Sequence, residues 1–544
     1  MSYLYFDTNM EAAGIHSVEF IFLLLLLFVA GLAALAKRFD TPYPIILVIG
    51  GLILSFFPRI PHVALNPYIV FLVILPPLLF SSAFVTSWRE FRYNLISITM
   101  LALGLVLFTV RGVAYFSHWI LPGFDFRLGL VLGAVVCTTD AIAATSIAQR
   151  IGLPKRITAV IEGESLVNDA SGLLALEFAV AFVLSGHIPG IAVRSERLAF
   201  IILSSIAIGL VVGKVINYFE SKIEDASIEI TISLIAPYIA YLSGESAHSS
   251  GVLSTVVCGL YLGHKSSLYL SIGARLRGSA VWETLTFILN GFVFILLGLQ
   301  LPYVLEGIHE YTIGRLLILG AEFSGFVIFL RLVWVYPGAW FSNLIRRRLL
   351  HQPERLADPG SIFIIGWTGM RGVVALAAAI SLPEFLNDGS PFPQRNLIIF
   401  LTFSVIFVTL VLQGLTLPPL IRWLGLADAD GENKEETQAR RAMVQAALAY
   451  LESARESEGP EIEPVYDELI RLQRQRLSLL DAKASGDPGR DPEHYDRYLA
   501  ISQHLRSLQR ATILNLRNHN RINDETLRKL EYELDLLDTR YART

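Results

Sequence analysis

The sequence is poor in cysteine and in charge for a chain of 544 residues. Its two cysteines, Cys137 and Cys258, have neither a CxxC arrangement nor metal-site spacing, so we interpret them as small core side chains. No Ser/His/Asp arrangement, HExxH helix or phosphate-binding loop stands out, which argues against an enzyme. No basic run favours nucleic acid as a partner, and we expect no cofactor.

Apolar residues are what the sequence has in abundance. They make up 53% of the chain, charged residues only 17%, and the mean hydropathy is +0.53. This composition is typical of a membrane protein. Positions 428–544 hold 18 basic and 23 acidic residues, whereas the preceding 427 positions hold 26 basic and 25 acidic ones. We therefore expect a membrane domain over 1–427 and a helical cytoplasmic tail over 428–544.

Segments long enough to span a bilayer recur through the first 427 residues, since a span needs roughly 20 apolar residues and fewer if it is short or broken. Lys and Arg favour one set of alternate loops, about 15 against six. The spans predict an all-α, multi-pass protein of the cell (inner) membrane. The Lys and Arg bias predicts an N-terminus outside and a C-terminus in the cytoplasm. The thirteen expected spans are 18–36, 43–57, 66–86, 94–119, 127–149, 157–184, 198–218, 228–243, 250–264, 280–301, 313–336, 361–382 and 396–423.

Ionisable residues inside a bilayer are costly and therefore indicate function. The sixth span contains the richest cluster: Ser165 and Asp169 are four residues apart on one helix face, and Glu164 and Asn168 are four apart on the adjacent face. Two polar stripes thus run side by side through an apolar helix. One stripe could line a cavity while the other pairs with a neighbouring helix. The alternative is that the acids only lock helices together through ion pairs.

Two further spans carry polar or glycine-rich interruptions. The fifth contains Thr139 and Asp140 at its middle, where a carboxylate can cap one half of a broken helix. The twelfth contains three glycines around Arg371, a permanent cation that needs a carboxylate partner when buried. Interrupted spans in both halves of a chain are typical of a transporter site at the midplane. Close helix packing is the competing explanation for the glycines.

Other charges in the spans are less informative from the sequence alone. Glu177, Glu283, Glu322 and Arg331 are expected near span ends or in local pairs, and Arg111 is expected to pair or to extend toward the interface.

Four motifs together resemble the monovalent cation:proton antiporter family, in its sodium/proton exchanger branch and in the style of a bacterial member. They are the run from Gly163 to Asp169, the pair Thr139-Asp140, the run from Gly369 to Gly372, and the run from Leu75 to Phe80. Their order and spacing match the family over about residues 18–423.

The resemblance implies a fold and a set of roles. The fold would be an inverted-repeat bundle with two discontinuous, crossing helices, and the protein would be a homodimer. Spans 4–6 and 11–13 would form the moving core. Asp169 would bind the monovalent cation or the proton, with oxygens from Asn168, Ser165 and Thr139. Asp140 would cap the broken helix, and Glu164 would form a structural ion pair with Arg371.

The sequence departs from the family pattern in three places. Ser81 stands where several relatives carry an acidic or another polar residue, Ala141 stands where many carry proline, and Arg111 is unusual. These departures leave open the preference among sodium, potassium and lithium.

The residues also suggest a mechanism. Burial disfavours a bare carboxylate, so Asp169 would hold either a cation or a proton, and this competition would produce exchange. Because Asn168 is neutral, we expect electroneutral one-for-one exchange that serves pH and sodium homeostasis. A potassium/proton antiporter and a cation channel are the alternatives.

Overall fold

The fold is all-α, as the sequence predicted, and the computed structural model contains no strand among the residues it describes. Those residues are 8–57, 66–121, 123–185, 191–306, 308, 311–351, 358–427, 429–457, 462–485, 492–519, 521, 526–527, 529–531 and 533–535. The chain divides into two compact units, Met1–Asp428 and Ala429–Thr544. The predicted boundary residue 428 itself lies outside the described residues.

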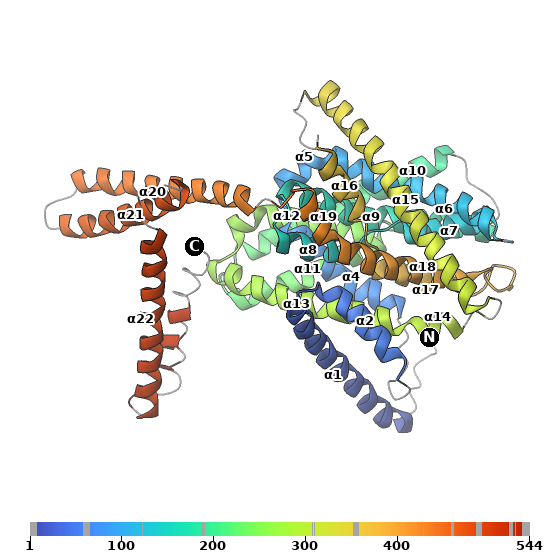
Figure 1. Cartoon of the computed structure of the whole chain (residues 1–544), viewed down its shortest axis with the longest axis horizontal. Coiled ribbons are helices and arrows are strands. Elements are labelled where there is room, and N and C mark those ends of the chain that lie inside the picture. The colour runs from blue at the N-terminus through green and yellow to red at the C-terminus, as the bar shows by residue number, and fades with distance from the viewer. Residues whose placement is uncertain are drawn as a thin grey trace. The chain divides into compact units, whose positions relative to one another are not determined.

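Helices account for nearly all of the first unit (Figure 1). Among the described residues, three short stretches of wider helical turn, labelled η1, η2 and η4, interrupt otherwise continuous helices, and a fourth, η3, ends α15. In chain order the elements are α1 (Thr8–Arg38), α2 (Tyr43–Ser55), α3 (Pro67–Ile69), η1 (Val70–Ile74), α4 (Leu75–Val85), α5 (Trp88–Thr99), η2 (Met100–Leu105), α6 (Val106–Ile120), α7 (Phe126–Val136), α8 (Ala141–Ile151), α9 (Lys155–Ser185), α10 (Ile191–Glu220), α11 (Ala226–Ser246), α12 (Gly251–Tyr269), α13 (Ile272–Leu299), α14 (Leu301–Glu306), α15 (Ile313–Ile345), η3 (Arg346–Leu350), α16 (Pro359–Trp367), α17 (Val373–Ile380), α18 (Arg395–Val408), η4 (Thr409–Gln413) and α19 (Gly414–Trp423).

The helix pattern supports a protein that crosses the membrane many times. Among the described residues, nine helical segments are long and apolar enough to span a bilayer, and Tyr43–Ser55 is a shorter apolar helix. Each of the thirteen expected spans falls on one or more helices. The number of spans, and the inverted repeat, stay predictions.

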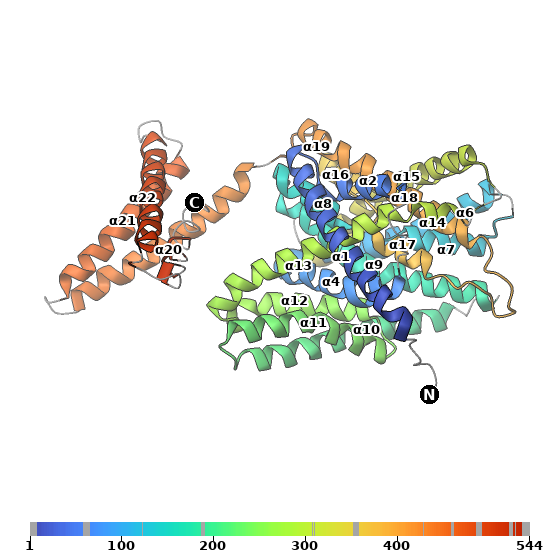
Figure 2. The same cartoon turned by 90° about the horizontal axis from the view of Figure 1, so that it is seen from below.

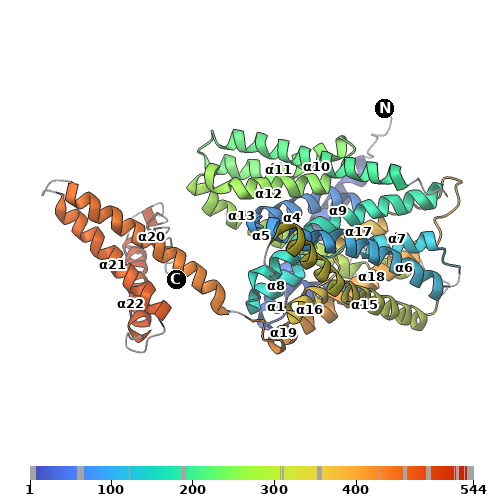
Figure 3. The same ribbon diagram turned by 90° about the horizontal axis from the view of Figure 1, so that it is seen from above.

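The helices of this unit pack as two groups. Group A comprises α1 to α4 and α10 to α13, in which α13 lies along α2 and α12 lies between α4 and α10. Group B comprises α5 to α9 and α15 to α19, in which α7 packs on α6 and α9, and α15 packs on α16 and α18. Figures 2 and 3 show α10 to α12 on one side and α15, α16, α18 and α19 on the other.

The second unit contains α20 (Ala429–Ser457), α21 (Glu463–Ser485) and α22 (Pro492–Asn518). α20 and α21 pack against each other, and ion pairs on their surface join Arg455 to Glu463 and Arg474 to Glu452. Exposed pairs of this kind contribute little to stability, typically less than about 1 kcal/mol each.

Candidate functional site

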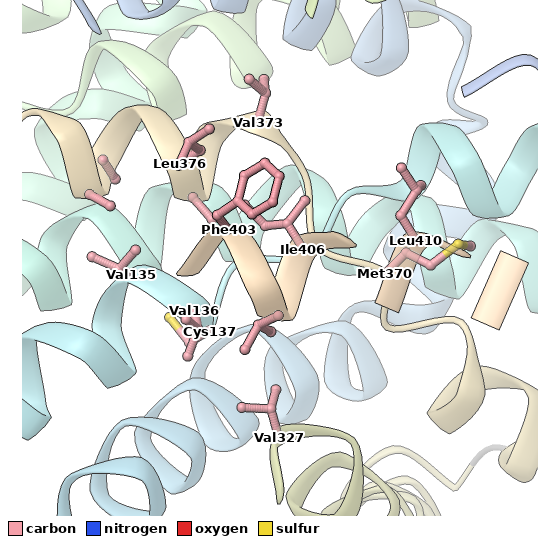
Figure 4. Packing of buried hydrophobic residues seen from close by; sticks show 14 of the residues in the cluster. Val135, Val136, Cys137, Val327, Met370, Val373, Leu376, Phe403, Ile406 and Leu410 are labelled. Carbon is pink, nitrogen blue, oxygen red and sulfur yellow. The ribbon is translucent and has the colours of Figure 1, made fainter. Parts of the chain in front are cut away.

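Both predicted interruptions are real breaks in the helices. α7 ends at Val136 and α8 begins at Ala141, while α16 ends at Trp367 and α17 begins at Val373. Both breaks lie among the side chains of one large apolar cluster. Figure 4 shows Val136 and Cys137 from the first break and Met370 and Val373 from the second within this cluster.

The two breaks satisfy each other's backbone groups. The Asp140 amide donates to the Met370 carbonyl over 2.8 Å. In return, Arg371 Nη1 donates to the carbonyls of Cys137 and Thr138, at 2.7 and 3.1 Å. Irregular backbone at membrane depth requires such internal partners, because lipid offers none. The polar residues that interrupt each helix therefore hold the two interruptions together.

Two side chains of α9 also form hydrogen bonds with the α7–α8 break. Ser165 Oγ donates to the Thr139 carbonyl over 2.9 Å and accepts the Ala141 amide over 3.2 Å. Asn168 Nδ2 donates to the Cys137 carbonyl at 3.2 Å and to Thr139 Oγ1 at 3.1 Å. The two adjacent polar stripes expected on this helix thus both face the α7–α8 break.

Asp140 lies at the N-cap of α8, where its carboxylate accepts the Ile142 amide over 2.8 Å. A negative charge here is favoured by the backbone dipoles of the helix that follows. Gly372 makes this position accessible, since a Cβ at residue 372 would lie 2.5 Å from Asp140 Oδ2. In the run from Gly369 to Gly372, residue 372 must therefore be glycine, because the two breaks approach each other closely there.

The structure corrects one predicted contact. Glu164 pairs with Arg331 of α15, not with Arg371: Nη1 and Nη2 of Arg331 lie 2.5 and 2.8 Å from the two carboxylate oxygens. Arg331 also donates to the carbonyls of Gly366 and Ile365, both at 2.9 Å. Arg371 points at backbone carbonyls instead.

The predicted partner of Glu164 was wrong because the eleventh expected span, 313–336, is too short. It puts Arg331 near a helix end. α15 continues to Ile345, so Arg331 is in the interior of the helix and only 1% exposed.

Asp169 has a different environment. It is only 6% exposed, and no hydrogen bond or ion pair of its carboxylate is found within the described part of the chain. The residue lines a cavity of about 60 Å³. A water needs about 10–15 Å³ on this scale, so the cavity has room for several waters or a partly hydrated cation.

The cavity lies between the two helix groups. Its polar lining from group B is Thr138, Thr139, Asp140, Ser165 and Asp169. Group A contributes Ser82 of α4 and Asn290 of α13, together with apolar residues of η1 and α4. Both polar residues from group A were missed from the sequence.

The predicted role of Asn168 in cation binding stays a prediction. Asn168 is not among the residues that line the cavity, and its Nδ2 holds the α7–α8 break. Its amide oxygen Oδ1 is buried without a hydrogen-bond partner in the described part of the chain. Among the described residues, no cluster of three or more His, Cys, Asp or Glu side chains is arranged to hold a metal ion.

Comparison with known proteins gives the family. Residues 23–423 match the transmembrane sodium/hydrogen exchanger family. The chain belongs to this family. An uncharacterized Na+/H+ exchanger of Mycobacterium tuberculosis is 32% identical over 505 residues, 92% of each chain, and one of Escherichia coli is 30% identical over 95% of this chain and 98% of its own. The resemblance read from the four motifs is therefore confirmed.

Two further comparisons concern a named antiporter and a solved structure. A Bacillus subtilis protein named a sodium, potassium, lithium and rubidium/H+ antiporter is 34% identical over 74% of this chain and 61% of its own length. The structure of the sodium proton antiporter MjNhaP1 from Methanocaldococcus jannaschii superposes with a TM-score of 0.60 at 17% identity. It covers 75% of this chain and 99% of MjNhaP1, and at that identity it supports the fold alone.

Proposed function

We propose that this exchanger moves Na+ or another monovalent cation across the membrane in exchange for protons, with Asp169 as the group that binds either ion. One observation carries the proposal: Asp169 is a buried carboxylate that has no cationic side-chain partner among the described residues, and it lines a cavity between two helix groups. The nearby hydroxyls of Thr139 and Ser165 supply the oxygen atoms that a hard monovalent cation prefers.

Competition at one carboxylate is enough to couple the two ions. A bare carboxylate in a low-dielectric site is costly, whereas a protonated or cation-bound one is neutral as a unit. Group B would therefore move relative to group A only when Asp169 carries a proton or a cation. Movement of one helix bundle against another around a central site is how many carriers alternate their access.

The stoichiometry follows from the groups next to Asp169 in the sequence and in the cavity. Asn168 is neutral, and the Asp140 carboxylate caps α8, where it accepts the Ile142 amide. Asp169 is then the one carboxylate that changes partners, so one cation replaces one proton. We propose electroneutral exchange on this basis.

The choice of cation is a second question. Na+ is favoured by the family and by most of the relatives named above, while the Bacillus subtilis relative is named for four monovalent cations. A cavity with room for a partly hydrated ion supports the broader range as a second candidate, including potassium/proton antiport.

Exchange in proteoliposomes tests the proposal. A pH-sensitive dye in the lumen should report proton movement when Na+, K+ or Li+ is added. Asp169→Asn should abolish this signal while the protein remains monodisperse. Glu177→Gln is the matched control, because Glu177 lies on the same helix but pairs with Arg197 and is half exposed. Normal exchange by Asp169→Asn would contradict the role of Asp169.

An imposed membrane voltage tests the stoichiometry. At fixed ion gradients, electroneutral exchange should proceed at the same rate with and without a voltage. A rate that follows the voltage would refute one-for-one exchange. Conductance without proton coupling would instead identify a cation channel.

Placement in the cell completes the proposal. We propose that this multi-pass protein lies in the cell (inner) membrane with its N-terminus outside and the 428–544 tail in the cytoplasm, and that it works as a homodimer.

A further inference from the structure

Asn290 is the one polar side chain between Phe287 and Leu299 of α13, and the exchange mechanism described above does not use it. It is 6% exposed and lines the same cavity as Asp169, Asp140 and Ser165. Its side chain interacts with Tyr43 of α2, and its amide oxygen Oδ1 is buried without a hydrogen-bond partner in the described part of the chain.

An unpartnered buried amide oxygen is destabilising, at about 1–3 kcal/mol. Protein structures retain few of them, and each calls for an explanation. The interaction with Tyr43 leaves Oδ1 without a partner in the described part of the chain, in a residue that lines the cavity. The oxygen is a neutral ligand of the kind that Asp169 would need to complete the shell of a cation.

The backbone holds Asn290 firmly on the group A side. Gly51 of α2 and Gly298 of α13 bring the two helix backbones into direct contact, since a Cβ at either residue would run into the other helix. Gly291, next in sequence, is covered by the Val29 side chain of α1 in the same way. Asn290 is therefore fixed to group A, whereas Asp169 belongs to group B.

We propose that Asn290 is a cation ligand supplied by group A, and that it contacts the cation on Asp169 in one access state only. This inference rests on the proposed exchange at Asp169. When the groups move relative to each other, Thr139 and Ser165 would travel with the ion, but the amide oxygen would stay behind. Asn290 would then raise cation affinity on one side of the membrane and ease release on the other.

Half-saturation for Na+, measured separately on the two sides of oriented proteoliposomes, tests the proposal. Asn290→Leu removes the amide and keeps a similar volume. On one side it should raise half-saturation about tenfold, which corresponds to about 1.4 kcal/mol of lost interaction. On the other side the change should be less than about twofold.

Two further variants separate a ligand from a structural role. Asn94→Leu is the control, because Asn94 is also buried, but its amide donates to the Glu90 carbonyl on α5 and it does not line the cavity. It should leave half-saturation unchanged on both sides. Asn290→Ser, which keeps an oxygen, should recover part of the affinity, and it serves as the test variant if Asn290→Leu does not fold.

The outcomes are distinguishable from failure of the proposed function. If wild-type protein exchanges Na+ for protons but Asn290→Leu has unchanged half-saturation on both sides, Asn290 is not a ligand. An equal change on both sides would overturn the one-state contact. If the wild type itself shows no cation-dependent proton movement, the proposed exchange function is refuted, and with it the role of Asn290.

Discussion

The ion pair between Glu164 and Arg331 allows a quantitative prediction. Arg331→Met keeps most of the side-chain volume but removes the guanidinium, which leaves the Glu164 carboxylate buried at 1% exposure without its partner. Breaking a buried ion pair in this way costs about 3–5 kcal/mol. The Gly366 carbonyl also loses its donor, which adds about 1 kcal/mol, while the Ile365 carbonyl keeps the Thr368 hydroxyl.

The expected loss is thus about 4–6 kcal/mol, a large part of the stability of a typical protein. Thermal unfolding in detergent should show it as a fall of roughly 5–10 °C in the apparent melting temperature. Arg197→Met is the control: its ion pair with Glu177 is half exposed, so its loss should cost less than about 1 kcal/mol.

A double-mutant cycle isolates the pair itself. Glu164→Gln combined with Arg331→Met removes both charges, so the double variant should be more stable than Arg331→Met alone. If the two single effects simply add, or if Arg331→Met melts with the wild type, the reasoning about this pair is refuted.

Two other predictions concern the α7–α8 break. Gly372→Ala should displace the Asp140 cap, because the added methyl group would lie 2.5 Å from Asp140 Oδ2. Ion exchange should then be at least tenfold slower than in the wild type. Exchange at the wild-type rate would show that the close approach of the two breaks is not needed for transport. Asn168→Ala should lower the melting temperature by the equivalent of about 1–2 kcal/mol, since two hydrogen bonds to the break are lost, yet still bind Na+. Calorimetric titration of Asn168→Ala with Na+ checks that binding is retained. A complete loss of Na+ binding would indicate that Asn168 is a direct cation ligand.

The sequence predicts the local features of this site well. Both breaks were found because polar or glycine residues interrupt apolar runs, and such interruptions act on the helix that contains them. The stripe of Ser165 and Asp169 was likewise visible, because helical spacing alone puts the two residues on one face.

Contacts between distant helices were harder to predict. A buried arginine needs either a carboxylate or several carbonyls as partners, and the sequence does not say which. Arg371 donates to backbone carbonyls, whereas Arg331 pairs with Glu164. Ser82 and Asn290 reach the cavity only through the packing of group A on group B. For Asn290 there was a usable signal, a lone amide in the middle of an apolar span.

Proton release on cation binding tests the central claim most directly. Purified protein in weakly buffered detergent solution, equilibrated at a pH where Asp169 is protonated, should release one proton for each Na+ bound. The apparent Na+ affinity should weaken about tenfold for each further unit of acidification, because the two ions compete for one group. Asp169→Asn should release none. Na+ binding to the wild type without proton release, or with an affinity independent of pH, would contradict competition at Asp169.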